Sequence, residues 1–228
     1  MDKKICVIID NDPQEENFKE NICTPLRQEF DISLIYINPN HPDFEGNDGM
    51  PDMQKVNAHI HTICSNSKIH IFASDLNYNI STFSGLDIIS EFRTYNKRTP
   101  VILYSANIKR AITSIIAPFM EKQITPEQAI TQIELLTTIN KYVNGKRYYE
   151  AVIRLIKKPE DILTDILLQN LKEHSEIICQ SCYPKFQGRN FGEIAHEIEC
   201  NSPHGIGFQN SIIEQTLAYL ADIHNEDK

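Results

Sequence analysis

Three short runs of aliphatic and β-branched residues, each followed by a polar residue, constrain the fold of this chain most strongly. They are Ile5–Ile9 before Asp10, Ile69–Ser74 before Asp75, and Val101–Tyr104 before Ser105. Nearly continuous apolar runs of this length are typical of parallel strands that are covered on both faces. Because ligands gather at the carboxyl ends of such strands, the three polar residues mark the expected site.

The N-terminal part alternates between strand-like runs and amphipathic segments. Two more strands are predicted at Asp31–Ile37 and Phe119–Glu121, with helices over 13–30, 51–64, 84–95 and 108–116. Thr125 and Pro126 are typical of a helix start, and that helix is expected to continue to Val143. Five strand–helix units predict an α/β fold, a doubly wound parallel sheet, over residues 1–143.

The pattern changes after residue 143. Helical periodicity over 148–156, 159–174, 191–198 and 209–223 predicts a mainly α-helical C-terminal region, residues 144–228. By count this region has 9 Lys and Arg against 13 Asp and Glu, and it has no basic recognition helix. A protein partner for its helices is therefore preferred over nucleic acid.

The composition argues against a nucleic-acid-binding, a membrane-spanning or a disulfide-rich secreted protein. The formal net charge of −9 gives no general electrostatic attraction to a polyanion. No apolar run is long enough to cross a membrane, and the N-terminus has no signal-peptide pattern. The six cysteines are scattered through a chain too large to need disulfide bonds for stability. We therefore expect a cytoplasmic protein without a membrane partner.

The strand-end carboxylates predict an oxygen-lined site suited to Mg²⁺ and a phosphoryl group. A carboxylate nucleophile forms an acyl phosphate only when the repulsion between the anions is neutralised, which calls for a divalent cation and an ammonium group. A small hydroxyl group such as that of Ser105 is able to donate to a phosphoryl oxygen.

Several motifs give the chain a resemblance to a known family. They are Asp75 with Asn77 two residues later, Gly85-Leu-Asp, Pro100-Val-Ile-Leu-Tyr-Ser-Ala, and Lys122 before Ile124-Thr-Pro-Glu-Gln. With these motifs, residues 3–143 resemble the receiver domain of bacterial response regulators. The resemblance implies a flavodoxin-like, five-stranded sheet of order 2-1-3-4-5.

The resemblance also implies roles for individual residues. Asp75 would accept a phosphoryl group from a histidine kinase or another phosphodonor, Ser105 and Lys122 would bind its oxygens, and Phe119 would be the switch aromatic. Mg²⁺ would be bound by Asp10, Asn11, Asp12, Asp75 and Asn77. Asn11 stands where the family has an acid, so weak Mg²⁺ binding is expected. The implied protein is a phosphorylation-dependent signalling switch of two-component type, not an enzyme.

Two other functions remain open. A degenerate pseudo-receiver would serve only as a binding scaffold. Asp10 and Asp12 also fit the Asp-x-Asp motif of haloacid-dehalogenase-type phosphatases, in which the first aspartate is the nucleophile and the second is the acid–base. The sequence leaves open whether the chain forms a homodimer.

The C-terminal region contains a possible zinc motif. Cys179-Gln-Ser-Cys182 and Cys200-Asn-Ser-Pro-His204 have zinc-ligand spacing, with His196 as an alternative fourth ligand. The alternative is that these cysteines are free core residues, since each pair lies beside apolar residues.

Overall fold

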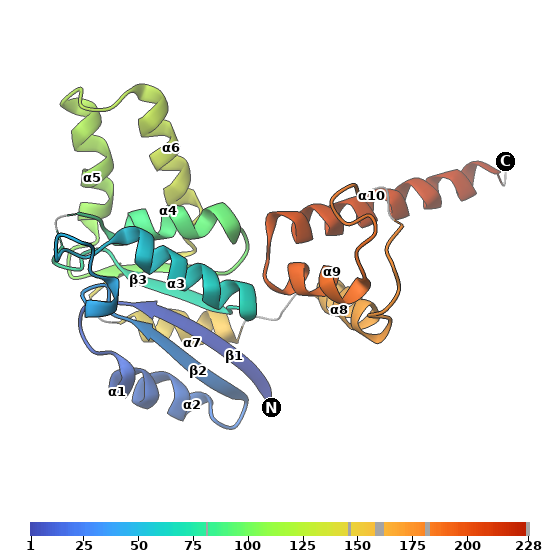
Figure 1. Ribbon diagram of the computed structural model, residues 1–228, viewed down its shortest axis with the longest axis horizontal. Helices are drawn as coiled ribbons and strands as arrows, with labels where there is room; N and C mark the ends of the chain where they lie inside the picture. The colour runs from blue at the N-terminus through green and yellow to red at the C-terminus, as the bar shows by residue number, and fades with distance from the viewer. Residues whose placement is uncertain (81, 146, 158–161, 181–182, 227–228) are drawn as a thin grey trace. The chain divides into compact units, whose positions relative to one another are not determined.

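The computed structural model of the chain describes residues 1–80, 82–145, 147–157, 162–180 and 183–226 (Figure 1). The chain divides into two compact units. The first contains Met1–Ser65, Ile69–Thr94 and Arg98–Lys158. The second contains Pro159–Lys228 with the short segments Asn66–Lys68 and Tyr95–Lys97.

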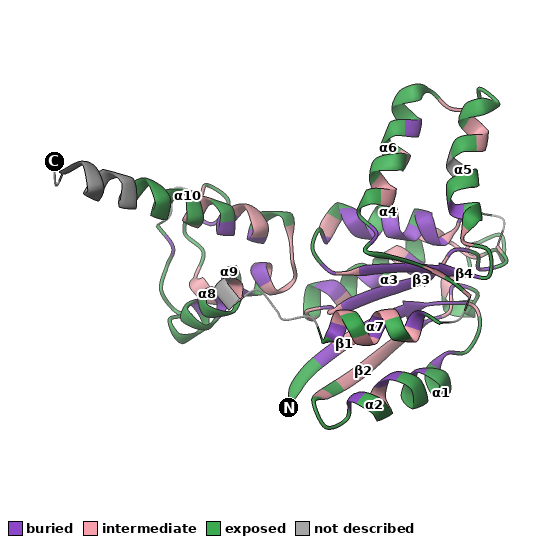
Figure 2. Ribbon diagram, turned by 180° about the vertical axis from the view of Figure 1, so that it is seen from behind, coloured by how far each residue is buried: buried purple, intermediate pink, exposed green. Residues whose placement is uncertain are grey.

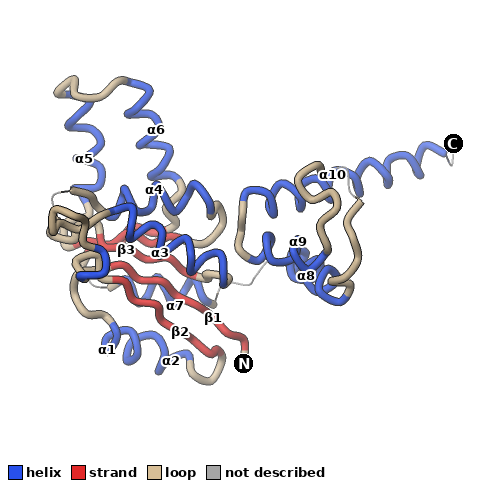
Figure 3. Tube along the Cα trace, in the orientation of Figure 1, coloured by secondary structure: helices blue, strands red, loops and turns tan. Residues whose placement is uncertain are grey.

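A parallel sheet of five strands forms the centre of the first unit (Figure 3). The strands are β1 (Asp2–Ile9), β2 (Phe30–Ile37), β3 (Ile71–Asp75), β4 (Val101–Ser105) and β5 (Lys141–Asn144). Their spatial order is β2-β1-β3-β4-β5, so the predicted fold class and strand order are confirmed. In this order the chain moves outward in opposite directions from β1, and the carboxyl ends of β1 and β3 form the switch point of the sheet.

Helices cover both faces of the sheet (Figures 1 and 2). One face carries α1 (Glu15–Phe18), the π-helical turn Lys19–Cys23, α2 (Thr24–Leu26) and α7 (Tyr148–Ile156). Here Cys6 and Ile8 of β1 pack with Phe18 and Tyr148. The other face carries α3 (Met53–Asn66) and α4 (Gly85–Tyr95), where Phe72 stacks on Phe92 at 4.0 Å. A short 3₁₀ turn, Pro42–Phe44, lies between β2 and α3.

The fifth strand is not where the sequence predicted it. Phe119–Glu121 is not a strand, because Phe119 belongs to α5 (Lys109–Met120), whose apolar residues recur at helical spacing. After α6 (Pro126–Thr137), Asn140 pairs with Val101 through its backbone N–H and its side-chain oxygen, at 2.9 and 2.8 Å. These two bonds fix β5 beside β4, inside the segment that the sequence predicted to be a helix ending at Val143.

The compact units do not divide at residue 143, where the sequence predicted the domain boundary. The first unit extends to Lys158, because α7 packs on the sheet rather than joining the C-terminal helices. Tyr148, Val152 and Ile156 recur at four-residue spacing, and all three are buried in the sheet's core. Residues 144–157 thus complete the α/β unit.

The second unit is helical, as expected. It contains α8 (Ile162–Glu173), α9 (Phe191–Glu199) and α10 (Pro203–Glu226). Leu171, Phe186, Ile194, Ile198 and Phe208 belong to its core. Asn190 and Glu193 form a capping box that begins α9. Within the described part of the chain, no helix has the length and apolar character needed to cross a membrane.

Candidate functional site

Acidic residues meet at the switch point of the sheet. Asp10 follows β1 directly, and Asp75 is the last residue of β3. The two strands are neighbours, with Ile9 paired to Ser74. Burial raises the pKa of Asp75 most, and the charges of Asp10 and Asp12 also raise it, so the three carboxylates interact electrostatically.

Asp10 is held inside the protein by hydrogen bonds. Its side chain is only 3% exposed. One carboxylate oxygen, Oδ1, accepts a bond from the backbone N–H of Asp12 at 2.9 Å. The other, Oδ2, accepts from Gln14 Nε2 at 2.9 Å and from the Tyr104 hydroxyl group at 2.7 Å. A carboxylate held by several donors keeps its orientation.

These bonds continue to the last helix of the unit. The Tyr148 hydroxyl group, on α7, donates to Gln14 Oε1 at 2.8 Å. The rings of Tyr104 and Tyr148 stack with their centroids 4.5 Å apart. We call Asp10, Gln14, Tyr104 and Tyr148 the Asp10 network. Burial, and then the charge of Asp10, raise the pKa of Tyr104 well above its usual value, so its hydroxyl group stays protonated and donates.

Asp75 has a different environment. It is half-buried, and its Oδ1 accepts from the backbone N–H of Asn77 at 3.1 Å. Burial raises its pKa to about 6, and the charges of Asp10 and Asp12 act in the same direction, partly offset by the bond from Asn77. At neutral pH Asp75 is therefore ionised, although burial and the neighbouring acids disfavour its charge. A cation that neutralises part of this negative charge would stabilise the ionised form.

Gly85 fixes the loop that follows Asp75. Its backbone N–H donates to the Leu76 carbonyl oxygen at 3.1 Å, and the Leu76 N–H donates to the Tyr104 carbonyl oxygen at 2.9 Å. A Cβ atom on Gly85 would lie 1.9 Å from the carbonyl oxygen of Asp75. In the same loop the buried Tyr78 hydroxyl group bonds with Ser74 Oγ. The start of α4 therefore rests directly on the Asp75 backbone.

Ser105 ends β4, beside Asn144 at the end of β5. It is buried, and its Oγ accepts from the backbone N–H of Asn107 at 3.2 Å. Its strand-end position agrees with the sequence analysis, and its phosphoryl-binding role remains a prediction.

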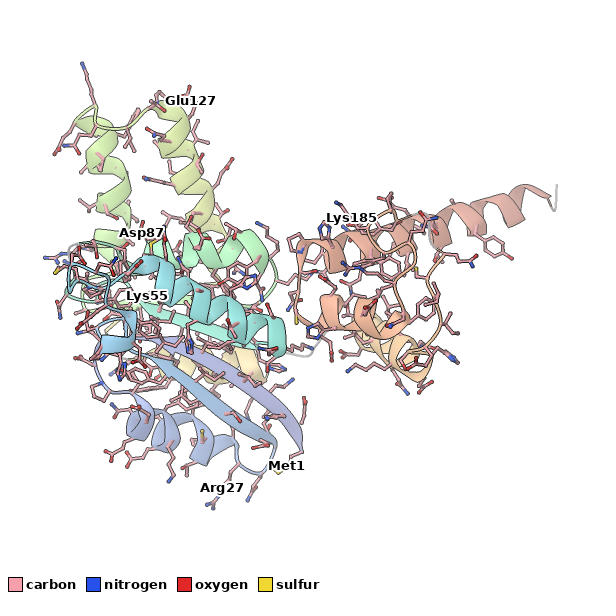
Figure 4. The ribbon with its side chains drawn as sticks, viewed as in Figure 1. Met1, Arg27, Lys55, Asp87, Glu127 and Lys185 are labelled. Atoms are coloured by element: carbon pink, nitrogen blue, oxygen red, sulfur yellow. The ribbon has the colours of Figure 1, made fainter. Side chains whose placement is uncertain are left out.

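The structure does not bring Phe119 and Lys122 to the site. Phe119 lies in the last turn of α5, and Lys122 lies in the turn between α5 and α6 with φ +57°. That turn is at the outer end of the helical pair, near Glu127, which is labelled in Figure 4. The structure therefore gives no support to the roles predicted for Phe119 as switch aromatic and Lys122 as phosphate ligand, which remain predictions. Both followed from placing the fifth strand at Phe119–Glu121.

The donor chemistry of the site suits Mg²⁺, because the side chains of Asp10, Asn11, Asp12 and Asp75 all offer oxygen atoms. Asn77 would add its backbone carbonyl group. In the described ranges, however, no three His, Cys, Asp or Glu side chains are arranged to hold a metal ion. Asp10 Oδ2 already accepts two hydrogen bonds. The residues fit a weak site that is not preassembled, and Mg²⁺ binding remains a prediction.

The zinc ligands predicted in the C-terminal region are only partly described. Cys182 lies outside the described residues, and Cys179 is buried in the core of the second unit. Cys200 Sγ lies 3.6 Å from His196 Nε2, and His204 Nδ1 lies 3.4 Å from the Tyr183 hydroxyl group. Zinc binding at Cys179, Cys182, Cys200 and His204 stays a prediction.

Replacement of Asp75 by Asn is expected to stabilise the protein at about pH 8 by about 1 kcal/mol. The pKa of Asp75 rises from its usual value near 4 to about 6 on folding. The folded state therefore binds more protons than the unfolded state between these values, and stability falls as pH rises through this window. Half-exposure screens the effect, which sets the modest magnitude.

Thermal unfolding from about pH 4 to pH 8 would measure this difference. The advantage of Asp75→Asn should be nearly gone near pH 4, where Asp75 is protonated in the folded state and about half protonated in the unfolded state. Glu134→Gln, a change on the exposed side of α6, is the matched control and should show no such pH dependence. An Asp75→Asn advantage that is equal at both pH values would show that the ionisation of Asp75 is not its cause.

Several solved structures are similar to the chain. The signal receiver domain of an HD domain-containing protein from Pseudomonas fluorescens Pf-5 is 8% identical, with a TM-score of 0.41, over 69% of this chain and 87% of that chain. A response regulator receiver domain protein from Clostridium thermocellum is 13% identical, with a TM-score of 0.39, over 67% and 90%. A chain from the complex of histidine kinase ThkA with response regulator protein TrrA is 14% identical, with a TM-score of 0.37, over 68% and 99%. No protein-family model and no curated protein matches the chain.

Proposed function

We propose that the first unit is a receiver-type signalling domain that accepts a phosphoryl group at Asp75. The position of Asp75 is the observation that carries this proposal. It ends the central strand at the switch point of a doubly wound sheet, beside the acids that follow β1. Of these acids, Asp10 is buried with both oxygens accepting hydrogen bonds, whereas Asp75 is only half-buried.

The proposed reaction is a phosphoryl transfer. An oxygen of Asp75 attacks the phosphorus atom of a phosphohistidine or of acetyl phosphate, and an oxygen–phosphorus bond forms as the bond to the leaving group breaks. The imidazole or acetate leaves with the electron pair, and water can later hydrolyse the acyl phosphate. Mg²⁺ held by Asp12, Asn11 and Asp75 would, when bound, neutralise part of the charge.

The Asp10 network offers a route from this site to the end of the unit. A phosphoryl group on Asp75 adds negative charge next to Asp10, whose carboxylate is held by Gln14 and Tyr104. Gln14 in turn accepts a hydrogen bond from Tyr148 on α7. A shift in these bonds would therefore reach α7, the last helix of the first unit. This route replaces the one predicted through Phe119.

Incubation of the full chain with acetyl phosphate and Mg²⁺, followed by intact-mass and peptide mass spectrometry, tests the proposal. We expect one phosphoryl group on Asp75, which Asp75→Asn abolishes. Lys122→Ala should label like the wild type, since Lys122 lies outside the site. Asn11→Asp should increase labelling at low Mg²⁺, because an added anionic ligand strengthens a hard-cation site.

Label on Asp10, or label that persists in Asp75→Asn, would contradict the proposal and favour a phosphatase. The matched control for loss of an acid is Asp43→Asn, a change at an exposed residue near β2 that should leave labelling intact.

A binding scaffold without phosphoryl transfer is the second candidate function. The Asp10 network favours it, because hydrogen bonds rather than a cation already organise the acid that follows β1. In that case acetyl phosphate gives no label under any Mg²⁺ concentration, and Asp75→Asn leaves affinity for the partner unchanged.

The second unit is proposed to be the protein-binding part of the chain. Its described surface exposes Ile166, Ile177, Ile213 and Leu217, and the region from residue 144 carries more acidic than basic residues. An apolar, acidic surface suits a protein partner better than a nucleic acid.

A further inference from the structure

Two helices leave the sheet together between β4 and β5. We call α5 and α6, with the turn 121–125 between them, the hairpin. It extends away from the sheet in Figure 1, and most of its surface is exposed in Figure 2. Six large apolar side chains of the hairpin have exposed fractions between 41% and 71%; they are Ile112, Ile116, Phe119, Met120, Ile130 and Ile133.

From helix geometry we infer that the six side chains share one face of the hairpin. On α5, residues 112, 116, 119 and 120 follow the spacing that lines one side of a helix, about a quarter to a half of a turn away from the buried Ala111. On α6, Ile130 and Ile133 lie on one side of the buried Ala129. Along each helix the stripe is turned from the buried alanine in the same rotational sense. Because the two helices run in opposite directions, such turns lead to the same side of the hairpin.

Charge points to a second copy of this chain as the occupant. The chain as a whole carries a net charge of −9, so most of its surface repels another copy. The hairpin is neutral, because Lys109, Arg110 and Lys122 balance Glu121, Glu127 and Glu134. A neutral apolar face does not attract a strongly charged partner. It is also the part of an acidic protein at which two copies can meet without electrostatic repulsion.

The exposed area is large enough for such a contact. Half-exposed side chains of this size offer on the order of 100 Å² each, or roughly 600 Å² for the face. Two copies would then bury about 1,200 Å², which is in the range of specific protein interfaces. When the apolar faces of two such hairpins pack against each other, the four helices form a four-helix bundle. The contact is isologous, with the same surface of each copy related by a two-fold axis.

We propose that the hairpin is a self-association surface through which two copies of the chain pair as a four-helix bundle. The proposal is independent of phosphoryl transfer at Asp75. Like charges placed in the middle of the face should prevent pairing without unfolding the chain, since Ile116 and Ile133 are about half-exposed in the single copy.

Sedimentation equilibrium of the full chain over a wide concentration range tests the proposal. We expect a monomer–dimer equilibrium, weakened at least about tenfold by Ile116→Asp with Ile133→Asp. A second pair, Met120→Lys with Ile130→Lys, tests the same face at other positions and should have the same effect. Circular dichroism and thermal melting confirm that each variant is folded.

The matched control changes Ile213 and Leu217 to Asp, because these residues form a comparably exposed apolar stripe on α10. It should leave the dimer intact. A wild-type chain that stays monomeric at every concentration would overturn the proposal. So would a dimer that survives both hairpin variants, or one that only the α10 change disrupts.

Discussion

Replacement of Gly85 by alanine is expected to lower the free energy of unfolding by about 3 kcal/mol. The new Cβ atom would lie 1.9 Å from the carbonyl oxygen of Asp75 and 2.6 Å from Ser74 Oγ. The nearest atom belongs to the backbone of β3, so the strand end or α4 must move. Urea unfolding of the purified variant measures the loss, and the displaced Asp75 should also lose its acetyl phosphate label.

Gly46→Ala is the matched control for this change. Its Cβ would first meet the Asp48 carboxylate at 3.1 Å, on a side chain that can turn away. We expect a loss below about 1 kcal/mol there. An equally small loss for Gly85→Ala would contradict the close contact between the start of α4 and the Asp75 backbone.

Tyr104→Phe should lower the free energy of unfolding by about 2 kcal/mol at neutral pH. The change keeps the ring that stacks on Tyr148 but removes the hydroxyl group that donates to Asp10 Oδ2. Burial of a carboxylate costs desolvation free energy, and without this donor less of that cost is offset by hydrogen bonds. Chemical denaturation of the wild type and the variant gives the difference.

A double-mutant cycle with Asp10→Asn separates this bond from other effects of the substitution. The loss from Tyr104→Phe should shrink once residue 10 carries no charge. Tyr142→Phe is the control, because the Tyr142 hydroxyl group donates to the Leu136 carbonyl oxygen at an exposed position and should matter by about 0.5 kcal/mol. Equal losses from Tyr104→Phe with and without the Asp10 charge would disprove the stabilising role of the bond.

The sheet could be predicted from the sequence because its signals are local. The apolar runs that end at Ile9, Ser74 and Tyr104 fix the three central strands, and the polar residue after each run lies at the carboxyl edge of the sheet. A parallel strand that is buried on both faces needs apolar residues at nearly every position, so its sequence is a recognisable apolar run.

The fifth strand lacked such a signal. Only four residues long, β5 is mostly exposed, and it is held by its pairing with β4 and by the two bonds between Asn140 and Val101 at its start. Its pairing partner lies 39 residues earlier in the chain. A short edge strand that depends on a distant partner cannot be recognised from its own residues. The predicted strand at Phe119–Glu121, the role given to Lys122 and the boundary placed at residue 143 all followed from missing it.

Most of the Asp10 network could not be predicted from the sequence either. Gln14, Tyr104 and Tyr148 come from three separate segments, and only the folded sheet brings their polar atoms within hydrogen-bond distance. Two local features could have drawn attention to them. Gln14 follows Asp10 by four residues at the start of a helix, and Tyr104 is a polar-tipped aromatic residue at the end of an otherwise aliphatic strand.

The position of α7 has a consequence for the order in which the protein can be made. The chain leaves the ribosome from its N-terminus, so β1 and Asp10 appear long before the helix that covers them. Tyr148 and Val152, which close the core beside β1, are among the last residues of the first unit to emerge. Until they arrive, Gln14 lacks its bond from Tyr148, and one face of the nascent sheet stays open to water. The first unit therefore completes its folding only when synthesis has passed residue 156, at the start of the C-terminal helices.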